Sequence, residues 1–292
     1  MRNKTLVKTN NYLSLVKFSH TIFSFPFAFI GFFLAIKLFD YKFDYKLLIL
    51  VALAVLFARN SAMGFNRFVD KEIDKINPRT ALREIPAKIL KPRSVLLFVI
   101  INSALFILTA FFINMLCFYL SPIALFVVLG YSFTKRFTFL SHLILGLGLS
   151  LAPLGAFLAV TGSFNILPLC FSFVVMFWVA GFDIIYALQD EGFDKDNKLK
   201  SIPAFFGKNK ALIISIIFHL CSVVFIIIAG LIGNFGIIYW FGSLIFVGLL
   251  FFQHSLVRPN DLKNVNLAFF TTNGFASVIF AAFVIGDMYL KV

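Results

Sequence analysis

Long apolar runs separated by short polar stretches dominate the chain. A helix that crosses a bilayer needs about 20 mostly apolar residues, and nine stretches meet that requirement. We place them at residues 13–38, 46–69, 93–114, 116–132, 139–161, 165–188, 208–232, 236–254 and 264–289. The pattern therefore predicts an all-α, polytopic membrane protein with nine transmembrane helices.

The composition supports a membrane protein. Of the 292 residues, 61% are apolar and only 13% are charged, about half the charged share of a soluble globular domain. A soluble domain of this size could not bury so much apolar surface, so lipid must be the solvent for much of the chain. The three cysteines lie in separate apolar runs without CxxC spacing, which indicates neither a zinc site nor a disulfide framework.

Lys and Arg residues gather on one side of the predicted membrane. With the N-terminus in the cytoplasm, 21 of the 26 fall on the inner side, four on the outer side and Arg59 within a span. Because positive residues prefer cytoplasmic loops, we expect a cytoplasmic N-terminus and an outside C-terminus, most simply in a bacterial inner (plasma) membrane. The net charge of +13 then serves topology and anionic lipid headgroups, and it gives no reason to expect nucleic acid.

A first acidic motif lies where the second span reaches the cytoplasm. Asn66, Asp70 and Asp74 are spaced four residues apart. On a continuing helix they share one face, about 6 Å apart per step. The connection that follows, near 67–93, is one of the two longest in the chain.

A second acidic motif ends the sixth span, before the other long connection, near 189–207. Asp183, Tyr186, Asp190 and Asp194 again fall on one helical face. The two motifs and their connections hold nine of the 13 acidic residues. Both helices run toward the cytoplasm, so both acidic faces should emerge at the same membrane surface.

The negative charge of the carboxylates at these positions must be offset by positive charge. Asp183 lies inside an apolar run, where an ionised residue costs about 2.5–3.5 kcal/mol near mid-helix, and like charges one turn apart repel. Shared divalent cations would remove both costs. Mg²⁺ takes oxygen ligands and is commonly held by one or two carboxylates and substrate phosphates. The two faces therefore predict two Mg²⁺ ions that clamp a diphosphate, whereas no GxxxxGK[ST] loop supports nucleotide hydrolysis.

Basic residues near both motifs could bind that diphosphate. Lys and Arg side chains neutralise the charge of a phosphate leaving group, although membrane anchoring is an equal explanation for the pair at the end of the fourth span. The candidates are Tyr131, Lys135 and Arg136 at that span's cytoplasmic end, and Arg79 and Arg83 after the first acidic motif.

Arg59 lies deeper, seven residues before Asn66 and on the same helical face. An intramembrane arginine is a functional candidate by default. We expect it to pair with Asp183 or to hold the carboxylate of an acceptor substrate. By contrast, the in-span Asn102 and Asn273 suit interhelical hydrogen bonds, and the scattered histidines read as ordinary polar residues.

Together these motifs resemble the UbiA superfamily of intramembrane prenyltransferases. The family's NxxxDxxxD motif is matched by Asn66, Asp70 and Asp74, its DxxY and DxxxD elements by Asp183, Tyr186, Asp190 and Asp194, and its YxxxK element by Tyr131 and Lys135. The resemblance spans nearly the whole chain and is closest to the 4-hydroxybenzoate polyprenyltransferase branch, to which the run from Phe57 to Pro86 points. One departure is Lys88, where relatives usually carry Gly.

The resemblance implies one domain over residues 1–292, with helices around a central cavity that opens to the cytoplasmic side. The similar stretches at 83–87 and 200–204 favour two weakly related halves, about 1–137 and 138–292. The implied enzyme uses Mg²⁺ to ionise a polyprenyl diphosphate and joins the allylic cation to 4-hydroxybenzoate, ortho to its hydroxyl, in quinone biosynthesis.

The implied roles divide the candidates into three groups. Asp70, Asp74, Asp190 and Asp194, with Asn66, would hold the metal. Arg79, Arg83, Lys135 and Arg136 would bind the diphosphate, with Arg59 and Tyr131 also on the substrate side. Tyr186 would stabilise the cation, and Asp183 would accept the ring proton.

Three alternatives stay open at this point. The same chemistry could act on 1,4-dihydroxy-6-naphthoate or another naphthoate for menaquinone. Another superfamily reaction, on haem, chlorophyll or a lipid glycerol, would use the same carboxylates. An ion-coupled transporter is more remote, because transport sites usually lie near the bilayer midplane. The sequence identifies no protein partner.

Overall fold

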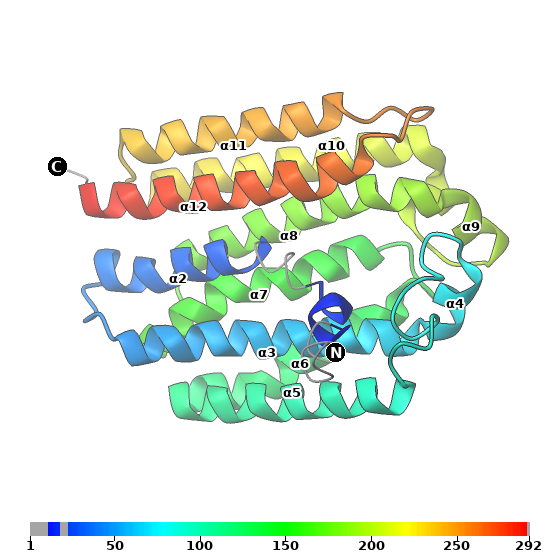
Figure 1. The fold of residues 1–292 in the computed structure, drawn as a ribbon. Helices are drawn as coiled ribbons and strands as arrows, with labels where there is room; N and C mark the ends of the chain where they lie inside the picture. Colours follow the sequence, from blue (N-terminus) through cyan, green and yellow to red (C-terminus); the bar gives the residue numbers. More distant parts are fainter. Residues whose placement is uncertain (1–10, 18–22, 291–292) are drawn as a thin grey trace, which may run out of the picture.

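The computed structural model describes residues 11–17 and 23–290, which form a bundle of long helices lying alongside one another (Figure 1). The long helices are α2 (Phe25–Leu38), α3 (Tyr45–Val69), α5 (Pro92–Ile113), α6 (Met115–Thr134), α7 (Ser141–Thr161), α8 (Ile166–Ala187), α10 (Ile202–Ile232), α11 (Ile237–Ser255) and α12 (Asn273–Leu290). Short helical segments are α4 (Lys71–Ile76), η2 (Leu188–Asp190), α9 (Glu191–Asp196) and the π-helical η3 (Leu267–Thr272). Within the described residues no β-strand forms beyond one isolated bridge.

Among the described residues, eight helices are long and apolar enough to cross a membrane, where the sequence predicted nine. The difference lies in the first predicted span, 13–38, of which α2 covers only 14 residues. At 1.5 Å per residue, such a helix is about 21 Å long, short of a bilayer core of about 30 Å. Pro26 stands in its first turn, a position where proline starts a helix. Residues 18–22 of that span, and Arg2, Lys4, Lys8 and Lys291 of the charge count, lie outside the described residues.

Side-chain caps define several helix starts. Each capping oxygen accepts a hydrogen bond from a backbone N–H that has no partner within its own helix. Asp44 caps α3, Asn114 caps α6, Asn165 caps α8 and Ser201 caps α10. These polar residues turn the chain between apolar helices, and the predicted boundaries of α3, α6 and α8 agree closely with the structure. The predicted boundaries of α5 and α7, whose starts have no side-chain cap, also agree closely.

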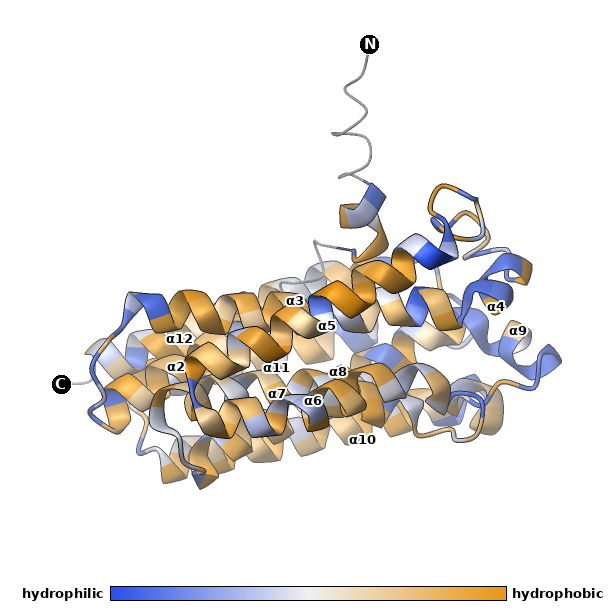
Figure 2. Cartoon of the chain, turned by 90° about the horizontal axis from the view of Figure 1, so that it is seen from below, coloured by the Kyte–Doolittle hydropathy of each residue, from blue (hydrophilic) through white to orange (hydrophobic). Residues whose placement is uncertain are grey.

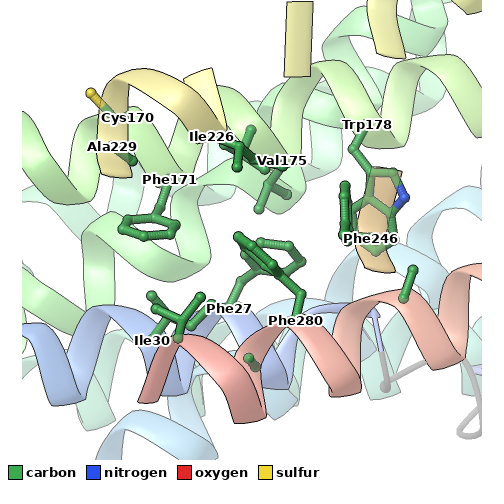
Figure 3. Close-up of a cluster of buried hydrophobic side chains, with 14 of the residues drawn as sticks. Phe27, Ile30, Cys170, Phe171, Val175, Trp178, Ile226, Ala229, Phe246 and Phe280 are labelled. Atoms are coloured by element: carbon green, nitrogen blue, oxygen red, sulfur yellow. The ribbon is translucent and has the colours of Figure 1, made fainter. Parts of the chain in front are cut away.

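A large apolar core joins α2, α8, α10, α11 and α12 (Figure 3). Trp178 of α8 is fully buried between Phe27 and Phe246, with ring centroids 5.3 and 5.8 Å away. Its indole Nε1 donates to Asn273 Oδ1 at 2.9 Å. This bond confirms Asn273 as an interhelical partner, as does the 3.1 Å bond from Asn60 to Asn102 between α3 and α5.

Polar residues collect at one end of the bundle. Figure 2 shows hydrophilic residues on α4, α9 and their connections, while the long helices are mostly hydrophobic. The two short helices lie side by side there in both views. Because α4 carries Asp74 of the first acidic motif and α9 carries Asp194 of the second, the fold brings the two motifs to the same end, as the sequence predicted.

Two glycines permit close helix contacts through α7. A Cβ on Gly146 would lie 2.2 Å from the carbonyl oxygen of Met176 in α8, and one on Gly31 of α2 would lie 1.9 Å from that of Pro153. Small residues at such crossings let backbones approach closely in membrane proteins. These contacts fix α7 between α2 and α8.

We predict that Gly146→Ala destabilises the protein by about 1–3 kcal/mol, because the added methyl group must push α7 and α8 apart. The measurement is the thermal midpoint of the detergent-solubilised protein. Gly155→Ala, on the same helix with nothing within 4 Å of the added Cβ, is the matched control and should keep the parent midpoint. Equal midpoints for both variants would contradict the close contact.

Candidate functional site

Both acidic motifs bend at their central aspartate. Asp70 separates α3 from α4 with φ −90° and ψ 6°, and Asp190 ends η2 directly before α9 with φ −100° and ψ 3°. The sequence predicted continuing helices, so these bends are a correction. Helical backbone hydrogen bonding is still partly kept at the first bend, because the Asp74 amide donates to the Asp70 carbonyl oxygen at 2.7 Å.

Asp70 is almost completely buried and is neutralised by two cations that directly follow α6. Its side chain is 2% exposed, and its oxygens lie 2.8 Å from Lys135 Nζ and 3.1 Å from Arg136 Nη2. Asn66 Nδ2 also donates to Asp70 at 3.1 Å. The predicted Asn66, Asp70, Lys135 and Arg136 therefore meet in one cluster. A carboxylate buried so deeply would be very costly without these partners.

The two carboxylate oxygens of Asp74 differ in their hydrogen bonding. Arg83 Nη1 donates to Asp74 Oδ1 at 2.6 Å, whereas the buried Oδ2 has no hydrogen-bond partner among the described residues. A buried, unpaired carboxylate oxygen is expensive. It points to a ligand that supplies positive charge or a donor.

Asp190 is held by residues from the connection after α4. Arg79 forms a bidentate ion pair with its carboxylate, and Asn77 Nδ2 donates to it at 3.1 Å. Arg79 Nη1 also donates to the hydroxyl of Tyr186 at 2.8 Å. Burial lowers the pKa of Arg79, but the charges and hydrogen bonds of Asp190 and Tyr186 raise it by more, so its pKa lies above the ordinary value and it stays a cation.

Asp194 joins the cluster through the start of α10. Ser201 Oγ donates to Asp194 Oδ2 at 2.8 Å, and the amide of Lys200 donates to the Lys135 carbonyl oxygen at 2.6 Å. The connection near 189–207 holds α9 and a short helical stretch that begins at Ile202. The backbone of Gly207, with φ 78° and ψ 163°, separates that stretch from the rest of α10, at the start of the predicted span 208–232.

Asp183 and Arg59 do not pair, contrary to one of our expectations. The Asp183 carboxylate instead accepts a 2.7 Å hydrogen bond from His142 Nδ1, while Arg59 donates to the carbonyl oxygens of Val16 and Lys17 at 3.4 and 3.2 Å. His142, Asn77 and Ser201 are site residues that the sequence did not single out. An in-span histidine is a signal that could have drawn attention to His142, but nothing in its spacing relates it to Asp183.

An apolar cavity of about 360 Å³ lies between α3, α5, α6 and α7. Its lining is almost wholly aliphatic and aromatic, with Arg59, Tyr131, Ser24 and Ser121 among the few polar contributors. The central cavity that the family resemblance implied, and its opening toward the cytoplasm, stay predictions.

Lys88 stands at a position where the family usually has glycine, and its backbone conformation explains that preference. Its φ of 59° lies in the left-handed region, which glycine enters without penalty and other residues enter at some cost. A glycine would therefore suit this backbone position, and lysine adopts the same turn with local strain. The Lys88 amide still donates to the carbonyl oxygen of Ile85 at 2.9 Å.

The donor set suits a hard divalent cation. Four aspartates and an asparagine supply oxygen ligands, the kind that Mg²⁺ prefers, and Asp74 offers an unsatisfied buried oxygen. Among the described residues no three His, Cys, Asp or Glu side chains converge closely enough to bind an ion as they stand. The basic side chains occupy the carboxylates instead, so a metal would bind as those ion pairs open.

These features define an α-helical integral membrane protein with an acidic and basic cluster at one end of the bundle and an apolar cavity between its helices. Residues 24–279 match the UbiA prenyltransferase family, and the chain belongs to that family.

Several curated relatives are 4-hydroxybenzoate octaprenyltransferases. The protein of Tolumonas auensis is 28% identical over 82% of this chain and 83% of its own length. The protein of Nitrosomonas eutropha is 30% identical over 84% of this chain and 85% of its own length.

Solved structures share the fold. A UbiA homologue from Aeropyrum pernix, solved without ligand, is 32% identical with a TM-score of 0.83, covering 92% of this chain and 98% of its own. A UbiA homologue from Archaeoglobus fulgidus bound to DMAPP and Mg²⁺ has a TM-score of 0.71 at 21% identity, covering 96% and 99%.

Proposed function

We propose that this protein transfers a polyprenyl group from a polyprenyl diphosphate to an aromatic acid in quinone biosynthesis. The observation that carries the proposal is the clustering of four aspartates with Lys135, Arg136, Arg79 and Arg83 at the polar end of the bundle. Such a set can hold a metal–diphosphate complex, and the 4-hydroxybenzoate octaprenyltransferases among the relatives favour 4-hydroxybenzoate as acceptor.

Two Mg²⁺ ions would be held by the two acidic motifs. Asp70 and Asp74, assisted by Asn66, would hold one ion, and Asp190 and Asp194 would hold the other. When bound, the metal neutralises the diphosphate and assists departure of the leaving group. Divalent metal use is supported by the Archaeoglobus fulgidus homologue, whose structure contains Mg²⁺ and DMAPP.

The basic residues exchange partners when substrate binds. Lys135, Arg136, Arg79 and Arg83 now neutralise carboxylates, and a diphosphate would offer them a second anion. As the C–O bond of the donor breaks, negative charge grows on the diphosphate, and these fixed cations stabilise it. The pairs therefore hold the cluster ready in the absence of substrate.

The apolar part of the donor and the acceptor need different surroundings. The cavity between α3, α5, α6 and α7 offers a dry lining for the polyprenyl tail. Arg59, which also lines it, would bind the acceptor's carboxylate, and Tyr131 would contact the acceptor ring. A water-poor site protects an allylic cation from hydrolysis.

In the chemical step the acceptor ring attacks the allylic cation ortho to its hydroxyl. Tyr186, whose ring packs 4.2 Å from that of Phe269, would stabilise the cation through its π face. Asp183 would then accept the ring proton. We propose that the enzyme works in a bacterial inner membrane with its N-terminus and the polar cluster on the cytoplasmic side, as the distribution of Lys and Arg favours.

The direct test supplies purified protein with a polyprenyl diphosphate, Mg²⁺ and either 4-hydroxybenzoate or 1,4-dihydroxy-6-naphthoate, and identifies products by mass spectrometry. We expect prenylated 4-hydroxybenzoate and no product in EDTA. A prenylated naphthoate alone would keep the mechanism and move the protein to menaquinone synthesis. If folded protein yields no product and releases no diphosphate, the result would contradict a prenyltransferase and would favour the transporter alternative.

A second prediction concerns the carboxylates. Asp70→Asn and Asp190→Asn should each abolish turnover at excess Mg²⁺ while the protein still folds, because each removes a ligand charge from one of the two metal positions. Asp196→Asn, in the same acidic segment but exposed, should retain parent activity. Full activity in either of the first two variants would refute the two-metal assignment, and size-exclusion profiles check folding.

A further inference from the structure

His142 and Asp183 form a partly buried pair beside the acidic and basic cluster. His142 is the second residue of α7 and is 4% exposed. Its Nδ1 lies 2.7 Å from Asp183 Oδ2 on α8. The pair joins two helices, α7 and α8, that pack closely together. Asp183 belongs to the family's acidic motif, whereas His142 lies outside that motif.

The hydrogen bonds around His142 fix its tautomer. The backbone N–H of Ile202 points to His142 Nε2 at 3.4 Å. A backbone N–H can only donate, so in this arrangement Nε2 is the acceptor and Nδ1 carries the hydrogen that faces Asp183. Ile202 is the first residue of α10, so the start of that helix supplies the donor to Nε2. His142 Nδ1 is thus the donor to Asp183.

Only one oxygen of Asp183 is used by this bond. Within the described part of the chain, Oδ1 makes no hydrogen bond, and the side chain is 22% exposed, against 5% for His142. The carboxylate is therefore anchored on its buried side and accessible on the other. An anchored carboxylate with one accessible oxygen can act as a base.

We propose that His142 is a positioning residue that holds Asp183 for removal of the proton from the prenylated ring. The inference rests on the proposed function. In the step, the ring carbon has bonded to the allylic carbon and the diphosphate has left. The ring C–H then breaks, its electron pair restores aromaticity, and its proton passes to Asp183 Oδ1. Water on the exposed side later removes that proton.

The consequence is a separation of two rates. Ionisation of the donor depends on the metal cluster, whereas proton removal depends on Asp183 and its anchor. Without His142, the allylic cation still forms, but its reaction with the acceptor ring reaches the prenylated product less often. Diphosphate release should then exceed formation of the prenylated product.

The experiment measures released diphosphate and prenylated product in parallel, with acceptor bearing hydrogen or deuterium on the ring. In the parent we expect equal amounts of both and no slowing by deuterium. In His142→Ala, product formation should fall about 100-fold, the KM for the donor should be unchanged, and deuterium should slow the reaction. Asp183→Asn should share the defect, and combining it with His142→Ala should add little because the residues act as a unit.

Two further variants keep the test decisive. His142→Gln has a donor and an acceptor on one side chain and should recover much of the coupling between diphosphate and product. His254→Gln, which alters a histidine paired with His219 at 2.8 Å elsewhere in the bundle, should behave like the parent. Equal loss of diphosphate release and product in both His142 variants would overturn the proposal. Product formation by the parent reports separately on the proposed function.

Discussion

Carboxylates at the edge of an apolar bundle must be matched by positive charge, and this requirement organises the polar end of the protein. Asp70 and Asp74 are nearly buried. Each is paired with cations that arrive from other segments, Lys135 and Arg136 from the end of α6 and Arg83 from the connection after α4. Removing one partner from such a pair costs far more than the pair itself gains. The segments that carry the partners are therefore held in place with the carboxylates.

The same constraint joins the two acidic motifs. Arg79 and Asn77 follow the first motif in sequence but bind Asp190 of the second. Ser201 and the backbone of Lys200 bring the start of α10 against Asp194 and Lys135. The cluster is consequently one unit built from four stretches of chain. A ligand that contacts one motif necessarily alters the electrostatics of the other.

Much of this arrangement could be predicted from the sequence, because apolar run length and charge placement have simple physical meanings. Eight spans and the meeting of both acidic motifs at one end followed from them. The short α2 did not, since the length of an apolar run does not specify that a helix begins at a proline, as α2 does with Pro26 in its first turn. The bends at Asp70 and Asp190 were also missed, because helical spacing assumes constant φ and ψ.

The remaining contacts of the site could not be predicted from the sequence, because they join segments that are far apart along the chain. Pairing of Asp183 with His142, rather than with Arg59, depends on the register of α7 against α8, which close contact at Gly146 fixes. No spacing within one helix encodes such a register. Likewise, the assignment of Arg79 to Asp190 depends on the path of a connection whose turns include the strained Lys88.

The paired carboxylates and cations must separate to receive a metal–diphosphate complex. A crystal structure with Mg²⁺ and an unreactive thio analogue of geranyl diphosphate would reveal this separation. We expect metal between the two acidic motifs, diphosphate oxygens facing Arg79 and Lys135, and both ion pairs of these residues opened. A bound analogue elsewhere, with the Arg79–Asp190 and Lys135–Asp70 pairs intact, would contradict it.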